Sequence, residues 1–450
     1  MVKVILQQQF FYNPLDMKKL LFLAASTMML AGSVKSQTVI TDTVSMGPGY
    51  SNFAFFNVSS GVKNTMPINS WHMSHTSNTR DNALKFNHTG DAFVYLYPNG
   101  DNKAFASFDT TGWQKWVKPY NDLVKHEEGA LNKQKSSNMW DFSWGVYDAA
   151  THKVVGDSMY LITLGKGQNM RFFKFMPVSQ ESNGDFIFTI AELNGSNAVT
   201  DTLKQSLANG ATYKYFNFTT MKQANVEPDA MEGWHLNFTR YYVPTLNQGV
   251  YIPYITAGVE SKRGIRIAKF KGLAWSDLQS NHAQLIDDAN TDTTGGKGFR
   301  NELTRVGHDW KTFNGQAFVV ADSMNYIVEV PTTSGKEFWG VRFIGFGGSS
   351  TGNVVLQRVL LTSLSSTEAL TKSFVIFPVP SNDQLFVKSI NNEPILSIHV
   401  YGLDGRILVS GDVDSNEEVT ALNISNLKSG QYIVEVKNKN GVQSQIINKL

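Results

Sequence analysis

The chain of 450 residues contains no cysteine. Disulfides, thiolate metal sites, iron–sulfur clusters and cysteine nucleophiles are therefore excluded, and so is a lipid anchor on an amino-terminal cysteine. A chain of this length can still fold without disulfides, because the fraction of surface buried on folding rises with chain size.

The sequence also lacks an excess of charge of one sign. Lysine and arginine number 40 against 38 aspartate and glutamate, and charged residues make up 17% of the chain. This balance creates no single-sign field, so nucleic acid is not expected as a partner. With 42% hydrophobic and 12% aromatic residues, the composition is that of a folded protein rather than a disordered one.

One apolar run lies near the start of the chain. Residues 20–30 follow the basic residues 17–19, and residues 34–36 offer small side chains for cleavage. This pattern predicts a signal peptide over residues 17–36, and hence export, while an upstream start codon chosen in error explains residues 1–16. No later run approaches the roughly 20 apolar residues that span a bilayer, so no transmembrane segment is expected.

Short apolar and aromatic runs broken by Gly, Asn, Asp and Ser dominate the remaining sequence, as in residues 53–58, 92–97 and 432–436. Alternation over runs of this length predicts strands and an all-β protein. Helical patterns are limited to residues 112–131 and 274–289. The chain length favours roughly three domains.

Three motifs occur twice, in the same order. Residues 55–60 resemble 215–220, residues 71–76 resemble 234–239, and residues 154–159 resemble 319–324. The interval from the Trp to the Val pair is 83 residues in the first copy (154 − 71) and 85 in the second (319 − 234). This spacing predicts two β-rich modules, over residues 45–200 and 205–365. Trp71 and Trp234 are expected to anchor their cores.

The end of the chain carries another set of motifs, in residues 374–387, 398–407, 422–436 and 448–450. In this order they resemble the type A C-terminal sorting domain of the type IX secretion system found in Bacteroidetes. The residues that carry the resemblance include Pro378, Pro380, Asp404, Gly405, Arg406, Gly430, Tyr432 and Lys449.

The resemblance implies that residues 369–450 form a small Ig-like β-sandwich recognised by the type IX secretion machinery. The chain would then reach the outer-membrane surface or the extracellular space, and the domain would be removed or exchanged for a surface anchor. Residues 404–405 and 429–430 are predicted to be hairpin turns within this sandwich. A generic carbohydrate-binding or adhesive β-domain is the alternative.

The two modules together, over residues 50–365, resemble the HmuY family of haem-binding surface proteins. The motifs that carry this resemblance are aromatic and lie in residues 140–145, 157–162, 171–175, 234–241 and 338–343. The resemblance implies two tandem HmuY-like modules that bind haem, or a similar flat porphyrin, for iron acquisition.

Haem iron accepts imidazole or thioether ligands. The candidate ligands are His72, Met73, His75, His88, His126 and His152. Trp144 stands where the family has one of its ligating histidines, and tryptophan cannot ligate iron. The alternative interpretation makes residues 72–75 partly exposed strand residues and places His126 and His152 in solvated turns.

Three functions stay open at this point. The first is capture of haem, free or from a haem-carrying protein, and the second is non-haem binding or adhesion that uses the same fold. The third is a hydrolase with an unrecognised site. No nucleophile–base motif is present, so the chain is expected not to be an enzyme.

Overall fold

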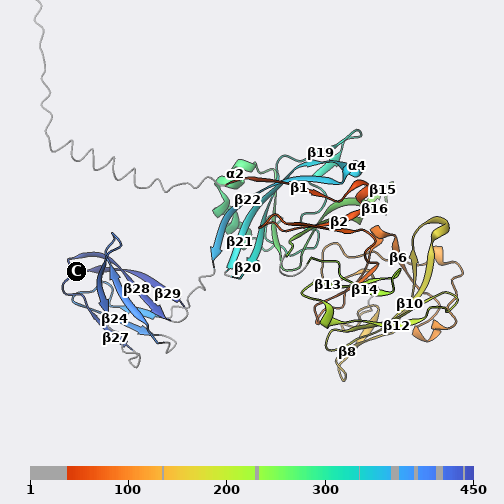
Figure 1. The fold of residues 1–450 in the computed structure, drawn as a ribbon, viewed down its shortest axis with the longest axis horizontal. Coiled ribbons are helices and arrows are strands. Elements are labelled where there is room, and N and C mark those ends of the chain that lie inside the picture. The colour runs from red at the N-terminus through yellow and green to blue at the C-terminus, as the bar shows by residue number, and fades with distance from the viewer. Residues whose placement is uncertain are drawn as a thin grey trace, which may run out of the picture. The chain divides into compact units, whose positions relative to one another are not determined.

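The computed structural model describes residues 38–133, 136–228, 233–333, 335–365, 374–389, 394–411, 419–438 and 441–450. They divide into two compact units: unit 1 holds most of residues 38–362, and unit 2 holds residues 363–450 (Figure 1). Strands form 48% of the described chain and helices only 11%, which confirms the all-β prediction. The predicted signal peptide at 17–36 and residues 1–16 lie outside the described residues.

Unit 1 contains two lobes, of which lobe I spans residues 73–224. Its strands are β4 (Met73–Thr76), β5 (Leu84–Phe86), β6 (Ala92–Leu96), β7 (Gly145–Asp148), β8 (Lys153–Gly156), β9 (Tyr160–Leu164), β10 (Arg171–Gln180), β11 (Phe186–Glu192), β12 (Val199–Leu203), β13 (Tyr213–Asn217) and β14 (Lys222–Ala224). The large sheet has the order β12-β11-β10-β9-β6, with β8 and β7 added beside β10. The small sheet has the order β14-β13-β4-β5.

Lobe II combines residues 40–67 with residues 236–365. Its strands are β1 (Ile40–Ser45), β2 (Asn52–Phe56), β3 (Lys63–Pro67), β15 (Leu236–Asn247), β16 (Val250–Ser261), β17 (Arg266–Lys271), β18 (Lys311–Phe313), β19 (Phe318–Val320), β20 (Met324–Thr332), β21 (Gly335–Phe346) and β22 (Asn353–Ser365). The large sheet has the order β1-β22-β21-β20-β17, the small sheet β3-β2-β15-β16, and β18 pairs with β19. The strand order therefore repeats that of lobe I.

The first three strands of each repeat complete the lobe that the rest of the other repeat forms. Strand β2 pairs with β15, so that Phe56 lies opposite Leu236, and β13 pairs with β4, so that Phe216 lies opposite Met73. The expected division at residues 200–205 placed β1–β3 with β4–β11, whereas the ladders join them to β15–β22. The predicted division assumed that strands close in the sequence pair with one another. The observed strands pair instead with partners far away in the chain, and the repeated motifs do not reveal this pairing.

An equivalent hydrogen bond to a histidine ring stabilises the exchanged strands in both lobes. The Val58 amide donates to His235 Nδ1 at 3.0 Å, and the Phe218 amide donates to His72 Nδ1 at 2.9 Å. Each ring thus accepts a hydrogen bond from the turn that follows the strand supplied by the other repeat. Burial lowers the pKa of both histidines to about 4, so both rings are neutral acceptors at physiological pH.

Each lobe has its own aromatic core. Trp144 and Phe175 are fully buried in lobe I, and Trp310 and Tyr326 are buried in lobe II. Trp144 precedes β7 and Trp310 precedes β18, so the two tryptophans occupy equivalent places ahead of a short hairpin. Burial of these rings removes a large apolar area from water and contributes the main stabilisation of each lobe.

Helices are short and lie in the connections. They are α2 (Trp275–Ser280), α3 (His282–Thr291), α4 (Gly348–Thr351), and the 3-10 turns η1 (Pro48–Tyr50), η2 (His88–Gly90), η3 (Asn102–Phe105), η4 (Trp113–Lys115), η5 (Ala130–Asn132), η6 (Gly167–Asn169) and η7 (Gln205–Leu207). The prediction of helix over residues 274–289 is confirmed by α2 and α3. The prediction over residues 112–131 is wrong, because only single 3-10 turns form there. No helix in the described part of the chain is long and apolar enough to cross a bilayer.

Unit 2 is a two-sheet sandwich. Its strands are β23 (Phe374–Phe377), β24 (Gln384–Ser389), β25 (Ser397–Tyr401), β26 (Ile407–Gly411), β27 (Val419–Asn423), β28 (Gly430–Asn438) and β29 (Gly441–Lys449). The sheets have the orders β23-β24-β27 and β26-β25-β28-β29, and their inner faces share one apolar core. Aligned packing of two antiparallel sheets over one core is the architecture expected for this segment.

One of the two predicted hairpin turns in unit 2 is present. Gly405 has φ 80° between the paired strands β25 and β26, as a tight turn requires. The prediction at residues 429–430 is wrong, since β27 pairs with β24 while β28 pairs with β25 and β29. Gly430 therefore begins a strand of the opposite sheet instead of closing a hairpin.

The other motif residues of unit 2 lie at or near the ends of strands. Pro378 and Pro380 follow β23, and the Tyr432 hydroxyl donates to the Lys428 carbonyl at 2.7 Å. Lys449 Nζ lies 3.4 Å from Asp383, while Arg406 is exposed beside Asp404.

Candidate functional site: a chamber between the lobes

The small sheets of the two lobes meet through a shared aromatic layer. Phe53 and Phe55 of β2 and Tyr213 and Tyr215 of β13 are buried in one cluster with Trp234. These residues are related by the duplication, since Phe55 and Tyr215 begin the repeated motif. Together with neighbouring polar side chains they line a chamber of about 90 Å³.

A half-buried carboxylate holds two aromatic side chains of the chamber lining. The Trp234 indole donates to Glu227 at 2.9 Å, and the Tyr215 hydroxyl donates to the same carboxylate at 2.8 Å. Glu227 also accepts from the amides of Thr212 and Tyr213. Charge-assisted bonds of this kind hold the two aromatic rings in one orientation.

The duplication places opposite charges at equivalent positions of the chamber. Lys85 lies opposite Ser74 in the ladder of β4 and β5, and Glu260 lies opposite Asn237 in the ladder of β15 and β16. Ser74 and Asn237 occupy the same place in the repeated motif. Burial raises the pKa of Glu260, and the nearby Lys85 charge opposes that rise.

Lys85 begins a hydrogen-bonded chain inside the chamber. Its Nζ donates to the Tyr213 hydroxyl at 2.8 Å, and that hydroxyl donates to the His126 carbonyl at 3.1 Å. Burial lowers the Lys85 pKa to about 8, although the Glu260 charge works in the opposite direction. Lys85 is therefore mostly charged at neutral pH, and two of its three ammonium protons are available for a ligand.

Several other polar groups of the chamber have no internal partner. Among the described residues, neither ring nitrogen of His126 has a hydrogen-bond partner. The same holds for four other buried atoms, which are His88 Nε2, Arg240 Nε, the Tyr241 hydroxyl oxygen and Asn237 Oδ1. All five residues line the chamber, and they come from both lobes. Burial without a partner costs about 1–3 kcal/mol for a polar group, so such a concentration indicates a binding site.

The histidines of the chamber are neutral. Burial lowers the pKa of His126 to about 3 and that of His88 to about 4. The His88 ring also stacks on Phe93 with centroids 5.4 Å apart, while its Nδ1 lies 3.1 Å from the Ala92 carbonyl. The two imidazoles can thus act as neutral donors or acceptors, or as metal ligands.

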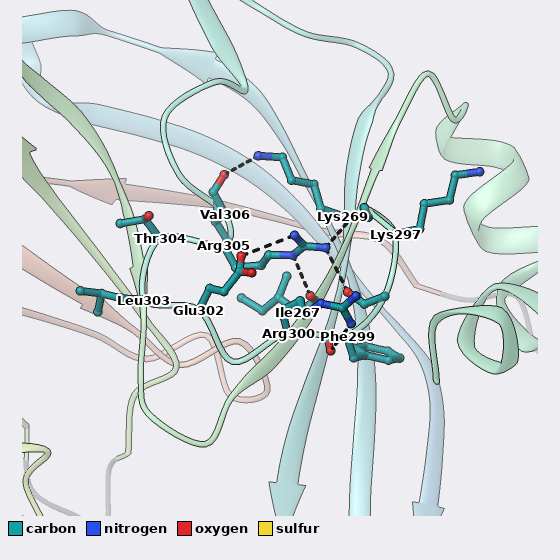
Figure 2. A network of polar contacts seen from close by, with 12 residues as sticks. Ile267, Lys269, Lys297, Phe299, Arg300, Glu302, Leu303, Thr304, Arg305 and Val306 are labelled. Atoms are coloured by element: carbon teal, nitrogen blue, oxygen red, sulfur yellow. Dashed lines mark hydrogen bonds and ion pairs between the residues drawn. The ribbon is translucent and has the colours of Figure 1, made fainter. Parts of the chain in front are cut away.

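A loop after α3 supports the segment that carries His126. Arg305 donates to the Ile267 carbonyl and Arg300 to the Phe299 carbonyl (Figure 2). Arg305 also donates to the carbonyls of Gly296 and Gly298, and Arg300 to those of Asp292 and Gly295. The stiffened loop then bonds to lobe I, because the Leu303 amide donates to Val124 and the Thr304 amide to Leu123. Residues 120–126 are in this way held against the chamber.

An apolar groove adjoins the chamber. It has a volume of about 470 Å³ and is lined by residues 120–124, Lys133, residues 242–244 and residues 251–253. Tyr120 and Tyr242, whose ring centroids are 5.1 Å apart, line both the groove and the chamber. The site therefore has a small polar part and a larger apolar part.

The predicted cluster of His72, Met73 and His75 does not form a ligand site. Met73 is fully buried in the core of lobe I, and His72 accepts the Phe218 amide. The His75 ring is fully buried, with Nδ1 2.9 Å from the Thr76 carbonyl and Nε2 3.1 Å from Gln180. The interpretation as partly exposed strand residues is also wrong, because the short strand β4 is covered on both faces.

The remaining candidates divide between the chamber and the surface. His88 and His126 line the chamber, so the placement of His126 in a solvated turn is wrong. His152 lies in a turn with Nδ1 2.9 Å from the Tyr147 hydroxyl, as the alternative interpretation expected. Trp144 is a core residue whose indole donates to the Asn82 carbonyl at 3.0 Å.

Sequence reasoning missed Lys85, Glu260, Arg240 and Tyr241. A signal was present in the repeat, because the motif that contains Ser74 and Asn237 identifies the strands whose neighbours carry Lys85 and Glu260. Within the described residues, no group of three or more His, Cys, Asp or Glu side chains is arranged to hold a metal ion.

Comparison with known proteins adds information on unit 2. Residues 375–449 match the secretion system C-terminal sorting domain. The match supports export of the chain to the cell surface or extracellular space and an interaction with the type IX secretion machinery. No HmuY family match was found, and no curated protein or solved structure matched the chain.

Proposed function

We propose that unit 1 is a binding module, displayed or released by the type IX route, whose chamber takes the carboxylate of a small ligand. The observation that carries this proposal is the set of buried polar groups without internal partners, supplied by both lobes to one chamber. A bound ligand would satisfy these groups and recover the free energy that their burial costs.

Charge favours an anionic group. Lys85 and Arg240 bring two positive charges to the chamber lining, and Glu260 and Asp122 bring two negative charges. Asp122 is already paired with Lys133, which lies outside the lining, so one positive charge is left in excess. A carboxylate would balance that charge and accept several hydrogen bonds at once. The volume of about 90 Å³ suits such a group rather than a whole drug-sized molecule.

Binding without catalysis is part of the proposal. A general base is normally oriented by a hydrogen bond from its second ring nitrogen to a third group. Neither ring nitrogen of His126 has such a partner among the described residues. The chamber thus offers recognition groups but no oriented nucleophile–base pair.

Calorimetric titration of the mature protein with propionate tests the proposal. Propionate is expected to bind in the millimolar range, and Lys85→Met and Arg240→Met are each expected to weaken binding at least tenfold, since each removes a charged donor. Arg171→Met is the matched control, because this arginine pairs with Glu192 on the surface of lobe I. Equal binding by all four proteins would overturn the proposal.

Haem is the second candidate, favoured by the two neutral imidazoles of His88 and His126. The donor types fit haem iron, whereas a chamber of about 90 Å³ does not contain a porphyrin, so the lobes would have to separate. Titration with haemin tests this function. A sharp, shifted Soret band that is lost in His88→Ala and His126→Ala supports it, and an unaltered spectrum of free haemin excludes it.

A further inference from the structure

The hairpin of β15 and β16 extends into an arm that has no counterpart in lobe I. In lobe I, β4 and β5 are only four and three residues long, whereas β15 and β16 pair over twelve residues each. Residues 241–259 contain no Asp, Glu, Lys or Arg. Large side chains are exposed along the arm, including Leu246 (60%), Val250 (64%), Tyr251 (70%) and Tyr254 (57%). Such an uncharged, exposed apolar surface calls for a functional explanation.

The arm is not built to accept another strand at its edges. Pro244 lies directly opposite Pro253 in the ladder, so each outer edge lacks a backbone donor at the same level. Prolines at this position block edge-to-edge pairing. Recognition by the arm therefore has to use its side chains.

One face of the arm covers the apolar groove. Tyr251 and Pro253 line the groove together with residues 120–124 of the opposite wall. The groove and the polar chamber share Tyr120, residues 121–123 and Tyr242 in their linings. The larger, apolar space thus begins where the small, polar space ends.

We infer that the ligand is an amphipathic monocarboxylate whose carboxylate enters the chamber and whose apolar chain lies in the groove under the arm. This inference rests on the proposed function, because it names the class of ligand for the same chamber. The chamber lies below, and the groove within, the 300–1,000 Å³ typical of ligand pockets. Lys85 and Arg240 both line the chamber and carry positive charge, while the groove offers mainly apolar walls to the chain.

A chain-length series tests the inference. The mature protein is titrated with propionate, hexanoate, octanoate and decanoate below their micelle concentrations, using the fluorescence of Trp71 and Trp234 at the chamber. Affinity is expected to rise about fourfold for each methylene that enters the groove. Constant affinity along the series, with propionate still bound, would overturn the inference and leave the proposed function standing.

Two variants of the arm locate the chain. Tyr251→Asp should abolish the dependence on chain length, whereas Tyr251→Phe should retain it because the apolar ring remains. Phe313→Asp is the matched control, since Phe313 is 59% exposed on the separate hairpin of β18 and β19. If affinity still rises with chain length in Tyr251→Asp, the apolar chain of the ligand lies elsewhere.

The remaining outcomes separate the two proposals. If neither propionate nor decanoate binds, the proposed function fails and the inference fails with it. If decanoate binds equally well to Lys85→Met and to the wild type, the carboxylate does not enter the chamber and the inference is overturned. The wild type could instead be a dimer that Tyr251→Asp converts to a monomer, with affinity independent of ligand chain length in both proteins. That result would overturn the inference and identify the groove as an interface between two copies of the protein.

Discussion

Lobe I and lobe II repeat one strand order, yet they differ in several parts of the candidate site. The sheets, the core tryptophans Trp144 and Trp310, and the histidine bonds of His72 and His235 occur in both lobes. Lobe I supplies the segment that carries His126, and lobe II supplies the long arm. The repeated features hold the fold and form the aromatic layer of the chamber, whereas the His126 segment and the arm complete the chamber and the groove.

The two lobes also differ in charge at one equivalent position. Lobe I has Lys85 beside Ser74, and lobe II has Glu260 beside Asn237. A duplication with identical charges would bring two like charges to one buried chamber, which would be destabilising. The change of sign lets both lobes face the same space, and it makes the chamber asymmetric toward a ligand.

The largest expected effect comes from removing unit 2, which should change the location of the protein but not the folding of the two lobes. Deletion of residues 369–450 should stop transport across the outer membrane completely, because the sorting domain lies there, while unit 1 stays folded as a compact body. Cell fractionation with an antibody against unit 1 should find the shortened chain in the periplasm, with a cooperative thermal transition. Continued display of the shortened chain on the cell surface would contradict this expectation.

The core tryptophans test whether the lobes are energetically equivalent. Trp144→Ala and Trp310→Ala should each lower the free energy of unfolding by about 3–5 kcal/mol, because both rings are buried and leave a cavity. Urea denaturation followed by circular dichroism measures the change. If the loss of unfolding free energy in one lobe is less than half of the loss in the other, the two lobes are not energetically equivalent.

The junction histidines should have a smaller effect that depends on pH. His72→Phe and His235→Phe each leave one backbone amide without its acceptor, at a cost of about 1–3 kcal/mol at pH 7. The pKa of each histidine is about 4 in the folded chain, whereas the unfolded chain takes up a proton near pH 6.5. The wild type should therefore lose stability as the pH falls from 6.5 towards 4.

Each junction histidine should account for about 2 kcal/mol of this loss between pH 7 and pH 5. Denaturation curves of the two variants at both pH values should show a smaller loss than the wild type, by similar amounts. If only one variant becomes less sensitive to acid, the two exchanges are not equivalent.

The charged pair should give the smallest effects, with opposite signs. Glu260→Gln removes a negative charge and should strengthen propionate binding about fivefold at neutral pH, since a charge–charge term near 1 kcal/mol is lost. Lys85 itself should lose its charge above its pKa of about 8, so wild-type affinity should fall between pH 7 and pH 9. Calorimetry at several pH values checks both statements, and pH-independent binding would exclude Lys85 from the contact.

The sequence by itself determined the fold class and the identity of the sorting domain at the end of the chain. Alternation of short apolar runs predicted strands because side chains in a strand point to opposite faces in turn. The motifs between residues 374 and 449 predicted the sorting domain, and local turn chemistry correctly predicted the turn at Asp404 and Gly405. Each of these properties is encoded in residues close together in the sequence.

Only the tertiary structure decided which strands pair and which histidines are used. The repeated motifs revealed that two copies exist, but the exchange of β1–β3 with β12–β14 depends on hydrogen bonds between residues far apart in the chain. His72 and His75 have the same donor atoms as His126, yet the fold uses the first two internally and leaves the third without a partner. A residue's chemistry is readable from its type, whereas its availability depends on long-range neighbours that sequence patterns do not specify.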